Sequence, residues 1–133
     1  MAEFPAPNDG ILLTYFLVSE NVARSRKFYT EVMGGEIVRE DAPAVIQLAN
    51  SWLIINTGGG PTEDKPGITL DTPKDQNKVS AFLNIRVADI ASIYKEWTKR
   101  GAKFLTPPTD RTYEIRAYLR DPDGYLIEVA QLV

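Results

Sequence analysis

One carboxylate in this sequence stands inside an apolar, strand-like run. Glu128 lies in the stretch YLIEVAQ, where Ile127 and Val129 flank it. Side chains alternate between the two faces of a strand, so Glu128 points away from the face on which its neighbours are buried. A carboxylate in that position is a candidate ligand-binding group, general base or partner of a buried cation. Its role depends on the side chains that share its face.

The same alternation collects further polar side chains on the face of Glu128. In AFLNIRV, residues 81–87, the apolar Leu83, Ile85 and Val87 are expected to face a helix. The set predicted for the opposite face in the second half of the chain is Phe82, Asn84, Arg86, Glu114, Arg116, Tyr118, Leu126, Glu128 and Ala130. The set predicted for the first half is mostly apolar: Leu13, Tyr15, Leu17, Val45, Gln47, Leu53, Ile55 and Thr57. An apolar wall with a few convergent polar groups is what a small-molecule pocket needs.

From these two faces we predict a ligand-binding set that combines apolar contacts with polar groups. Its members are Tyr15, Gln47, Leu53, Phe82, Asn84, Arg86, Arg116, Tyr118 and Glu128. A structural alternative exists for the charged members, because a buried charge needs a partner whatever the function. Arg86 or Arg116 paired with Glu128 would then be an internal ion pair, and Tyr15 and Phe82 would be ordinary packing residues.

The elements that must position these residues repeat once along the chain. A strand, a helix that ends at a glycine and three further strands are expected in each half. In the first half the predicted strands are 11–18, 36–40, 44–49 and 51–57, and the helix is capped by Ser19 or Asn21. In the second half the predicted strands are 79–87, 102–105, 114–120 and 125–132, and the helix is capped by Asp89. Such a repeat indicates an internal duplication, although one α+β sheet with chance similarity between its halves is the alternative. We expect a single domain over residues 1–133, with module one at about 9–58, a loop at 58–77 and module two at about 78–132.

Composition excludes several functional classes. A chain of 133 residues with 44% hydrophobic and 25% charged residues is typical of a soluble globular domain. Its net charge of −3 is unlike the basic character of a nucleic-acid binder. The longest apolar run, ILLTYFLV, is too short to cross a bilayer, and the N-terminal MAEFPAPNDG is unlike a signal peptide. We therefore expect a cytoplasmic protein with neither nucleic acid nor membrane as a partner.

The duplicated βαβββ order, the Phe28-Tyr29 pair in a glycine-ended helix and above all DPDGYLIEV resemble the vicinal oxygen chelate superfamily. That superfamily includes glyoxalase I, bleomycin-resistance proteins, fosfomycin-resistance enzymes and extradiol dioxygenases. The resemblance covers about residues 11–132. It implies an α+β fold of two βαβββ modules whose curved sheets surround a cup, with the helices outside.

Enzymes of this superfamily hold a divalent metal with His and Glu side chains on the first and last strands of each module. The resemblance carries these positions to Leu13, Ile55, Phe82 and Glu128. Three of the four are apolar and the chain contains no histidine, whereas a zinc site takes three or four N, S or O ligands from the protein. We therefore predict neither a protein-held metal nor another cofactor.

The leading hypothesis is a protein that binds a small organic molecule, an antibiotic or a metabolite, as the bleomycin-resistance branch does. The alternative is a lyase- or isomerase-type enzyme in which Glu128 is the catalytic base and Arg86 or Arg116 stabilises an enolate-like anion. A third hypothesis is an interaction module with a vestigial cup. Members of the superfamily commonly pair, and exposed apolar sheet faces mark interfaces, so a C2 homodimer is expected.

Overall fold

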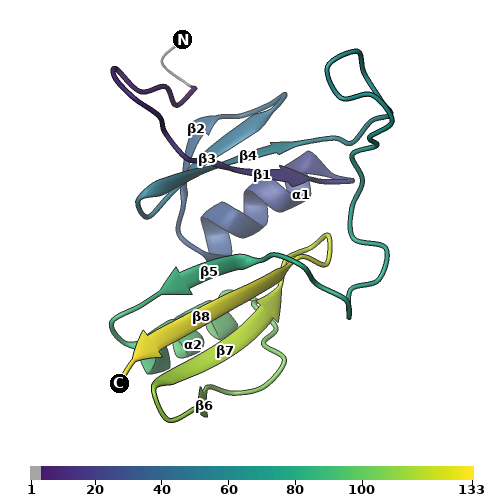
Figure 1. Ribbon diagram of the computed structural model, residues 1–133. Coiled ribbons are helices and arrows are strands. Elements are labelled where there is room, and N and C mark those ends of the chain that lie inside the picture. Colours follow the sequence, from purple (N-terminus) through teal and green to yellow (C-terminus); the bar gives the residue numbers. More distant parts are fainter. Residues whose placement is uncertain (1–3) are drawn as a thin grey trace. The chain divides into compact units, whose positions relative to one another are not determined.

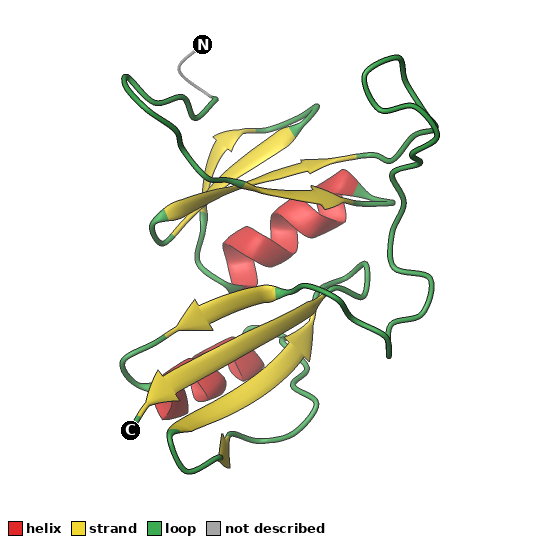
Figure 2. Ribbon diagram, viewed as in Figure 1, coloured by secondary structure: helices red, strands yellow, loops and turns green. Residues whose placement is uncertain are grey.

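The computed structural model describes residues 4–133 and divides the chain into two compact units, with the boundary between Thr72 and Pro73. Each unit holds one four-stranded sheet and one main helix (Figures 1 and 2). The boundary lies within residues 58–77, the range of the predicted connecting loop. Unit one contains β1 (Tyr15–Val18), α1 (Val22–Lys27), the π-helical turn η1 (Phe28–Val32), β2 (Glu36–Arg39), β3 (Ala44–Leu48) and β4 (Ser51–Asn56). Unit two contains β5 (Leu83–Arg86), α2 (Ile90–Lys99), β6 (Thr109–Asp110), β7 (Glu114–Arg120) and β8 (Leu126–Leu132).

The two sheets have the same strand order. It is β1-β4-β3-β2 in unit one and β5-β8-β7-β6 in unit two. In each sheet the first strand of the unit pairs in parallel with the last, and the other pairs are antiparallel. The predicted α+β fold of two βαβββ modules is therefore confirmed.

The helix of unit one begins at a side-chain cap and ends at a glycine. The backbone N–H of Arg24 donates to Oδ1 of Asn21 at 3.0 Å, so Asn21 is the cap of the two candidates. Ser19 instead is buried and shares a hydrogen bond of 2.8 Å with the Ser25 hydroxyl. After η1 the chain leaves the helix at Gly34, whose φ of 83° is the left-handed conformation that glycine adopts readily.

The helix of unit two covers one face of its sheet. Asp89 caps α2 as predicted, because its Oδ1 accepts from the backbone N–H of Ser92 at 3.2 Å. Ile90 and Trp97 on α2 are buried, as are the apolar residues of one sheet face: Ala117, Leu119, Ile127 and Val129. Alternation along β7 and β8 then leaves their polar residues on the face away from α2. Among residues 4–133 neither helix has the length and apolar character that crossing a membrane would require.

Three predicted strands differ from the observed ones. The first strand starts at Tyr15 rather than at residue 11, and Ile11 and Leu13 are 96% and 87% exposed. The strand predicted at 79–87 is only β5, Leu83–Arg86. No strand spans 102–105: Phe104 forms an isolated bridge to Leu119, and the edge strand is the short β6. Pro107 and Pro108 lie between the two pairings, and proline has no N–H with which to continue a ladder.

Candidate functional site

Three polar residues of module two form one row across the sheet. Asn84 on β5, Glu128 on β8 and Tyr118 on β7 are paired neighbours in the strand register. The Asn84 amide donates to Oε1 of Glu128, and the Tyr118 hydroxyl donates to Oε2. Glu128 is only 5% exposed, whereas Asn84 is exposed and Tyr118 half-buried. The row thus holds a buried carboxylate in a fixed orientation on the face away from α2.

Arg86 and Arg116 on this face pair with Glu114, not with Glu128. Arg86 Nη2 lies 3.1 Å from Glu114 Oε1, and Arg116 Nη1 lies 3.7 Å from Glu114 Oε2. The predicted alternative of an ion pair between either arginine and Glu128 is therefore wrong. Ala130 stands between Arg86 and Arg116 in the register, and its single methyl group leaves room for the Arg86 side chain to extend across β8.

Phe82 completes this face beside the carboxylate. Its ring lies edge-on to that of Tyr118, with 6.2 Å between the ring centroids. The Phe82 side chain is 40% exposed. Aromatic pairs of this geometry are favourable because the positive edge of one ring meets the negative face of the other. Asn84, Arg86, Arg116, Tyr118 and Glu128 thus share one face of the paired strands, and Phe82, which precedes β5, joins them through its contact with Tyr118.

The Tyr118 hydroxyl is electrostatically coupled to Glu128. Its hydrogen bond to the Glu128 carboxylate raises the pKa of Tyr118 above the ordinary value of 10.0, because the bond is made by the protonated phenol. Burial and the negative charge of Glu128 raise this pKa further, while Arg116 acts in the opposite direction. Tyr118 is therefore a hydrogen-bond donor throughout the physiological pH range.

The predicted face of module one is corrected by its register. Tyr15 and Ile46 are both paired with Leu53, so these three side chains share one face. Ile46 packs against the end of the helix: its Cγ2 lies 2.5 Å from the place where a Cβ on Gly35 would be. Leu53 is 1% exposed and belongs to the core beneath α1, so Tyr15 and Leu53 lie on the helix-covered face. The prediction that both line the face away from the helix is wrong.

The other face of module one carries a different set of side chains. Gln47 pairs with Trp52, and Phe16 and Val45 pair with Ile54. Phe16 is 49% exposed and Gln47 is exposed. Of the predicted module-one residues Tyr15, Gln47 and Leu53, only Gln47 therefore lies away from the helix.

The same correction moves the metal-ligand positions of module one. The pair Phe16 and Ile54 occupies the register place that Asn84 and Glu128 hold in module two, so Ile54 rather than Ile55 corresponds to Glu128. Ile55 is fully buried on the helix side, and Leu13 lies outside the strand. Within residues 4–133 no three His, Cys, Asp or Glu side chains gather as a candidate metal site. A single carboxylate whose neighbours donate an amide and a phenol hydrogen does not fit the ligand set of zinc.

One segment near the site is not recognisable from the sequence pattern. Residues 73–81 fall in the predicted loop and at the start of a predicted strand, yet they form one wall of a cavity of ≈ 250 Å³ against the β7–β8 turn. The only sequence feature that reflects this close packing is Gly124, and a glycine at that position is already expected from the turn alone. The backbone there passes so close to Gln76 that a Cβ on Gly124 would lie 2.3 Å from Gln76 Nε2.

Two βαβββ modules with identical mixed sheets define the fold of glyoxalase and bleomycin-resistance proteins. Residues 11–129 match the Glyoxalase/Bleomycin resistance protein/Dioxygenase superfamily. The chain belongs to this family.

Solved structures show the same fold at low sequence identity. A glyoxalase/bleomycin resistance protein/dioxygenase from Nocardioides is 17% identical, with 96% of this chain and 87% of that chain covered and a TM-score of 0.73. TnmS3, an antibiotic binding protein from Streptomyces sp. CB03234, is 14% identical, with 96% and 100% covered and a TM-score of 0.68. The fosfomycin resistance protein FosX from Listeria monocytogenes is 13% identical, with 94% and 95% covered and a TM-score of 0.69.

Proposed function

We propose that this protein binds a small organic molecule, an antibiotic or a metabolite, on the module-two face without a protein-held metal. The observation that carries the proposal is the buried Glu128 carboxylate, oriented by Asn84 and Tyr118 on the face away from α2. Fixed polar groups beside an exposed aromatic ring are the elements with which a pocket orients a ligand. We expect the protein to act in the cytoplasm, in agreement with its composition.

Similar proteins support the class of ligand. TnmS3 is described as an antibiotic binding protein and FosX as a fosfomycin resistance protein. Their identity to this chain is too low to transfer a ligand. They support the proposal because TnmS3 is an example of a protein of this fold that binds an antibiotic.

The alternative function is proton abstraction by Glu128 in a lyase- or isomerase-type reaction. The arginines that would stabilise an anionic intermediate are tied to Glu114. This observation favours binding over catalysis.

A thermal-shift screen against antibiotics and metabolites tests the proposal, with calorimetry to confirm each hit. We expect at least one compound to raise the melting temperature of the wild type and to lose affinity in Glu128→Gln. The matched control is Glu96→Gln, which removes an exposed carboxylate that pairs with Arg100 on the surface of α2. Hits that bind Glu128→Gln and the wild type equally would overturn the site assignment. Deuterium incorporation into a bound hit in D₂O would establish the enzymatic alternative instead.

A further inference from the structure

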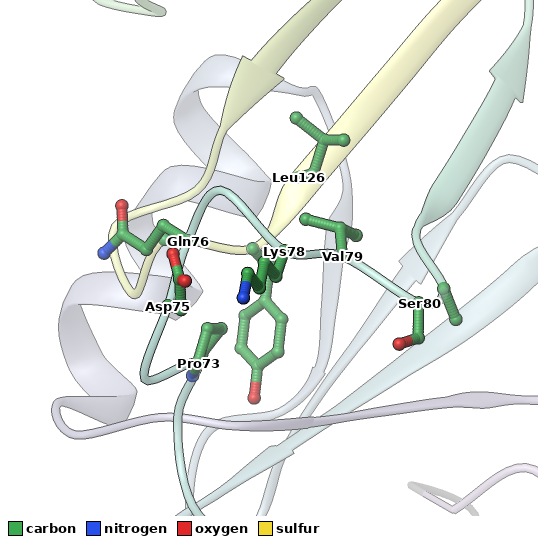
Figure 3. A pocket seen from close by; sticks show the side chains of 10 residues that line it. Pro73, Asp75, Gln76, Lys78, Val79, Ser80 and Leu126 are labelled. Atoms are coloured by element: carbon green, nitrogen blue, oxygen red, sulfur yellow. The ribbon is translucent and has the colours of Figure 1, made fainter.

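The cavity at the start of module two is built from two segments that are far apart in the sequence. Its walls come from residues 73–81 and from the β7–β8 turn with the first residue of β8 (Figure 3). Apolar lining residues include Pro73, Val79, Tyr125 and Leu126. The volume of ≈ 250 Å³ is below the ~300–1,000 Å³ of pockets that enclose a whole drug-sized ligand. The cavity therefore suits a ring-sized fragment.

Hydrogen bonds to one arginine hold the wall of this cavity in place. Arg120 Nη1 donates to the backbone oxygen of Gln76 at 2.7 Å, and Nη2 donates to Oδ1 of Asn77 at 3.3 Å. Arg120 extends from β7, so the segment 73–81 is fastened to the sheet. The cavity is thus part of the folded unit rather than a gap beneath a free loop.

The cavity and the carboxylate adjoin along β8. Leu126 lines the cavity, and Glu128 is the next residue of β8 whose side chain is on the same face. Two residues of a strand span about 7 Å. A small molecule with a ring in the cavity and a short chain can therefore reach the carboxylate.

Glu128 lacks a cationic partner within the described part of the chain. Its two hydrogen-bond donors, Asn84 and Tyr118, are neutral. Of the arginines on the same face, Arg86 and Arg116 are paired with Glu114, and Arg120 donates to oxygens of Gln76 and Asn77. A carboxylate accepts up to about four hydrogen bonds, so each oxygen can accept another. Burying a carboxylate is unfavourable unless it is paired. An ammonium group would supply both the missing charge and further donors.

The rim of the cavity does not itself select for charge. Asp75 and Lys78 are both exposed lining residues, and their charges are opposite. Charge selection is therefore assigned to Glu128 and shape selection to the apolar wall.

We infer that the ligand of this protein is a small arylalkyl amine, with its ring in the cavity beside Leu126 and its ammonium group on Glu128. The inference rests on the proposed function and specifies the ligand class for the same site. It adds the cavity residues Val79, Tyr125 and Leu126 to the residues that contact the ligand.

A series of phenylalkylamines of increasing chain length tests the inference, with the matching phenylalkyl alcohols as neutral controls. Binding is followed by backbone amide shifts in NMR and by calorimetry. We expect the best amine to shift the amides of residues 73–81 and 124–128 and to bind about tenfold or more tighter than its alcohol. In Glu128→Gln the amine and the alcohol should bind alike. Leu126→Ala and Val79→Ser should both weaken the binding of the amine and of the alcohol. Val79 is the more exposed of the two residues, so Val79→Ser still tests the cavity if Leu126→Ala fails to fold.

The outcomes separate this inference from the proposed function. If amine and alcohol bind the wild type equally, or shift no amides of the cavity, the inference is wrong. Library hits that still depend on Glu128 would then leave the proposed function intact. If neither the amines nor any library compound binds in a Glu128-dependent way, both are wrong.

Discussion

Tyr118 and Glu128 face each other across the β7–β8 pair, and the phenol donates its proton to a carboxylate that is almost fully buried. The bond exists only while the phenol is protonated. The protonation state of Tyr118 therefore affects the orientation of Glu128. As a result, the row formed by Asn84, Glu128 and Tyr118 is sensitive to alkaline pH.

We expect Tyr118 to ionise above the pH at which a free phenol does. Its pKa is raised above 10.0, chiefly by the hydrogen bond to Glu128. A group with a raised folded-state pKa contributes stability that is fully present below its unfolded pKa, near 10 for a phenol. That contribution is lost as pH rises through the folded-state pKa. The difference between tyrosinate titrations of the wild type and of Tyr118→Phe should be one group that ionises above about pH 10; a difference group that ionises at or below that pH would contradict the pairing.

We expect Glu128→Gln to destabilise the free protein only modestly. Had Glu128 balanced a buried arginine, its loss would cost about 3–5 kcal/mol. Its partners are instead an amide and a hydroxyl, both of which can turn to suit a glutamine, so the expected loss is about 1 kcal/mol. Urea denaturation measures this difference. The control Glu114→Gln, which leaves two partly exposed arginines without their shared carboxylate, should cost about 1 kcal/mol or less. A loss of several kcal/mol for Glu128→Gln with unchanged ligand binding would make Glu128 a structural residue.

The two modules differ in how well the sequence predicts their faces. In β7 polar and apolar residues alternate, and in β8 Glu128 is a single charged residue between the apolar Ile127 and Val129. Hydropathy alone therefore separates Tyr118 and Glu128 from Leu119 and Val129. In β1 and β4 both faces are apolar, as in Phe16-Leu17-Val18 and Ile54-Ile55. Hydropathy then gives no register, and an error of one residue moves every side chain to the other face. This ambiguity is why the prediction for Tyr15 and Leu53 is wrong.

Other parts of the structure depend on contacts between distant segments. Alternation predicts the correct face for Glu114, but its role in pairing both arginines depends on the register of three strands and on the small Ala130 between them. The cavity wall depends on Arg120 binding the backbone of Gln76, a contact between residues 44 positions apart. Alternation and turn residues cannot indicate either contact.

We expect the purified protein to carry no stoichiometric zinc, nickel, manganese or iron. Glu128 is the only carboxylate at the four family positions, and its oxygens are hydrogen-bonded to Asn84 and Tyr118. Elemental mass spectrometry should give a metal-to-chain ratio near zero, and EDTA should leave the melting temperature unchanged. A ratio near one that EDTA removes together with ligand binding would show that a metal is held there.

We expect the protein to form a homodimer in solution. Module one exposes large apolar side chains outside its core, among them Phe16 at 49%, Ile11 at 96% and Leu13 at 87%. Exposed apolar surface of this kind commonly marks an interface, and twofold pairing is the commonest closed symmetry. Light scattering across a dilution series should give twice the chain mass. The variant Phe16→Ser should shift the equilibrium toward monomer, whereas Phe82→Ser on module two serves as a comparison; a wild type that stays monomeric at micromolar concentration would contradict the prediction.

Gly124→Ala should alter the cavity without unfolding the protein. Gly124 has a φ of 93°, and a Cβ there would lie 2.3 Å from Nε2 and 2.4 Å from Cδ of Gln76, so the Gln76 side chain must move. The matched control is Gly101→Ala, because Gly101 has a φ of 112° and nothing lies within 4 Å of the place where its Cβ would be. Both changes force alanine into a left-handed conformation, which costs about 1–2 kcal/mol, so urea denaturation should show similar losses. Only Gly124→Ala should shift the amides of Gln76 and Asn77 and change the affinity for a ligand in the cavity. Equal spectra and equal affinities for the two variants would mean that Gln76 does not shape the cavity wall.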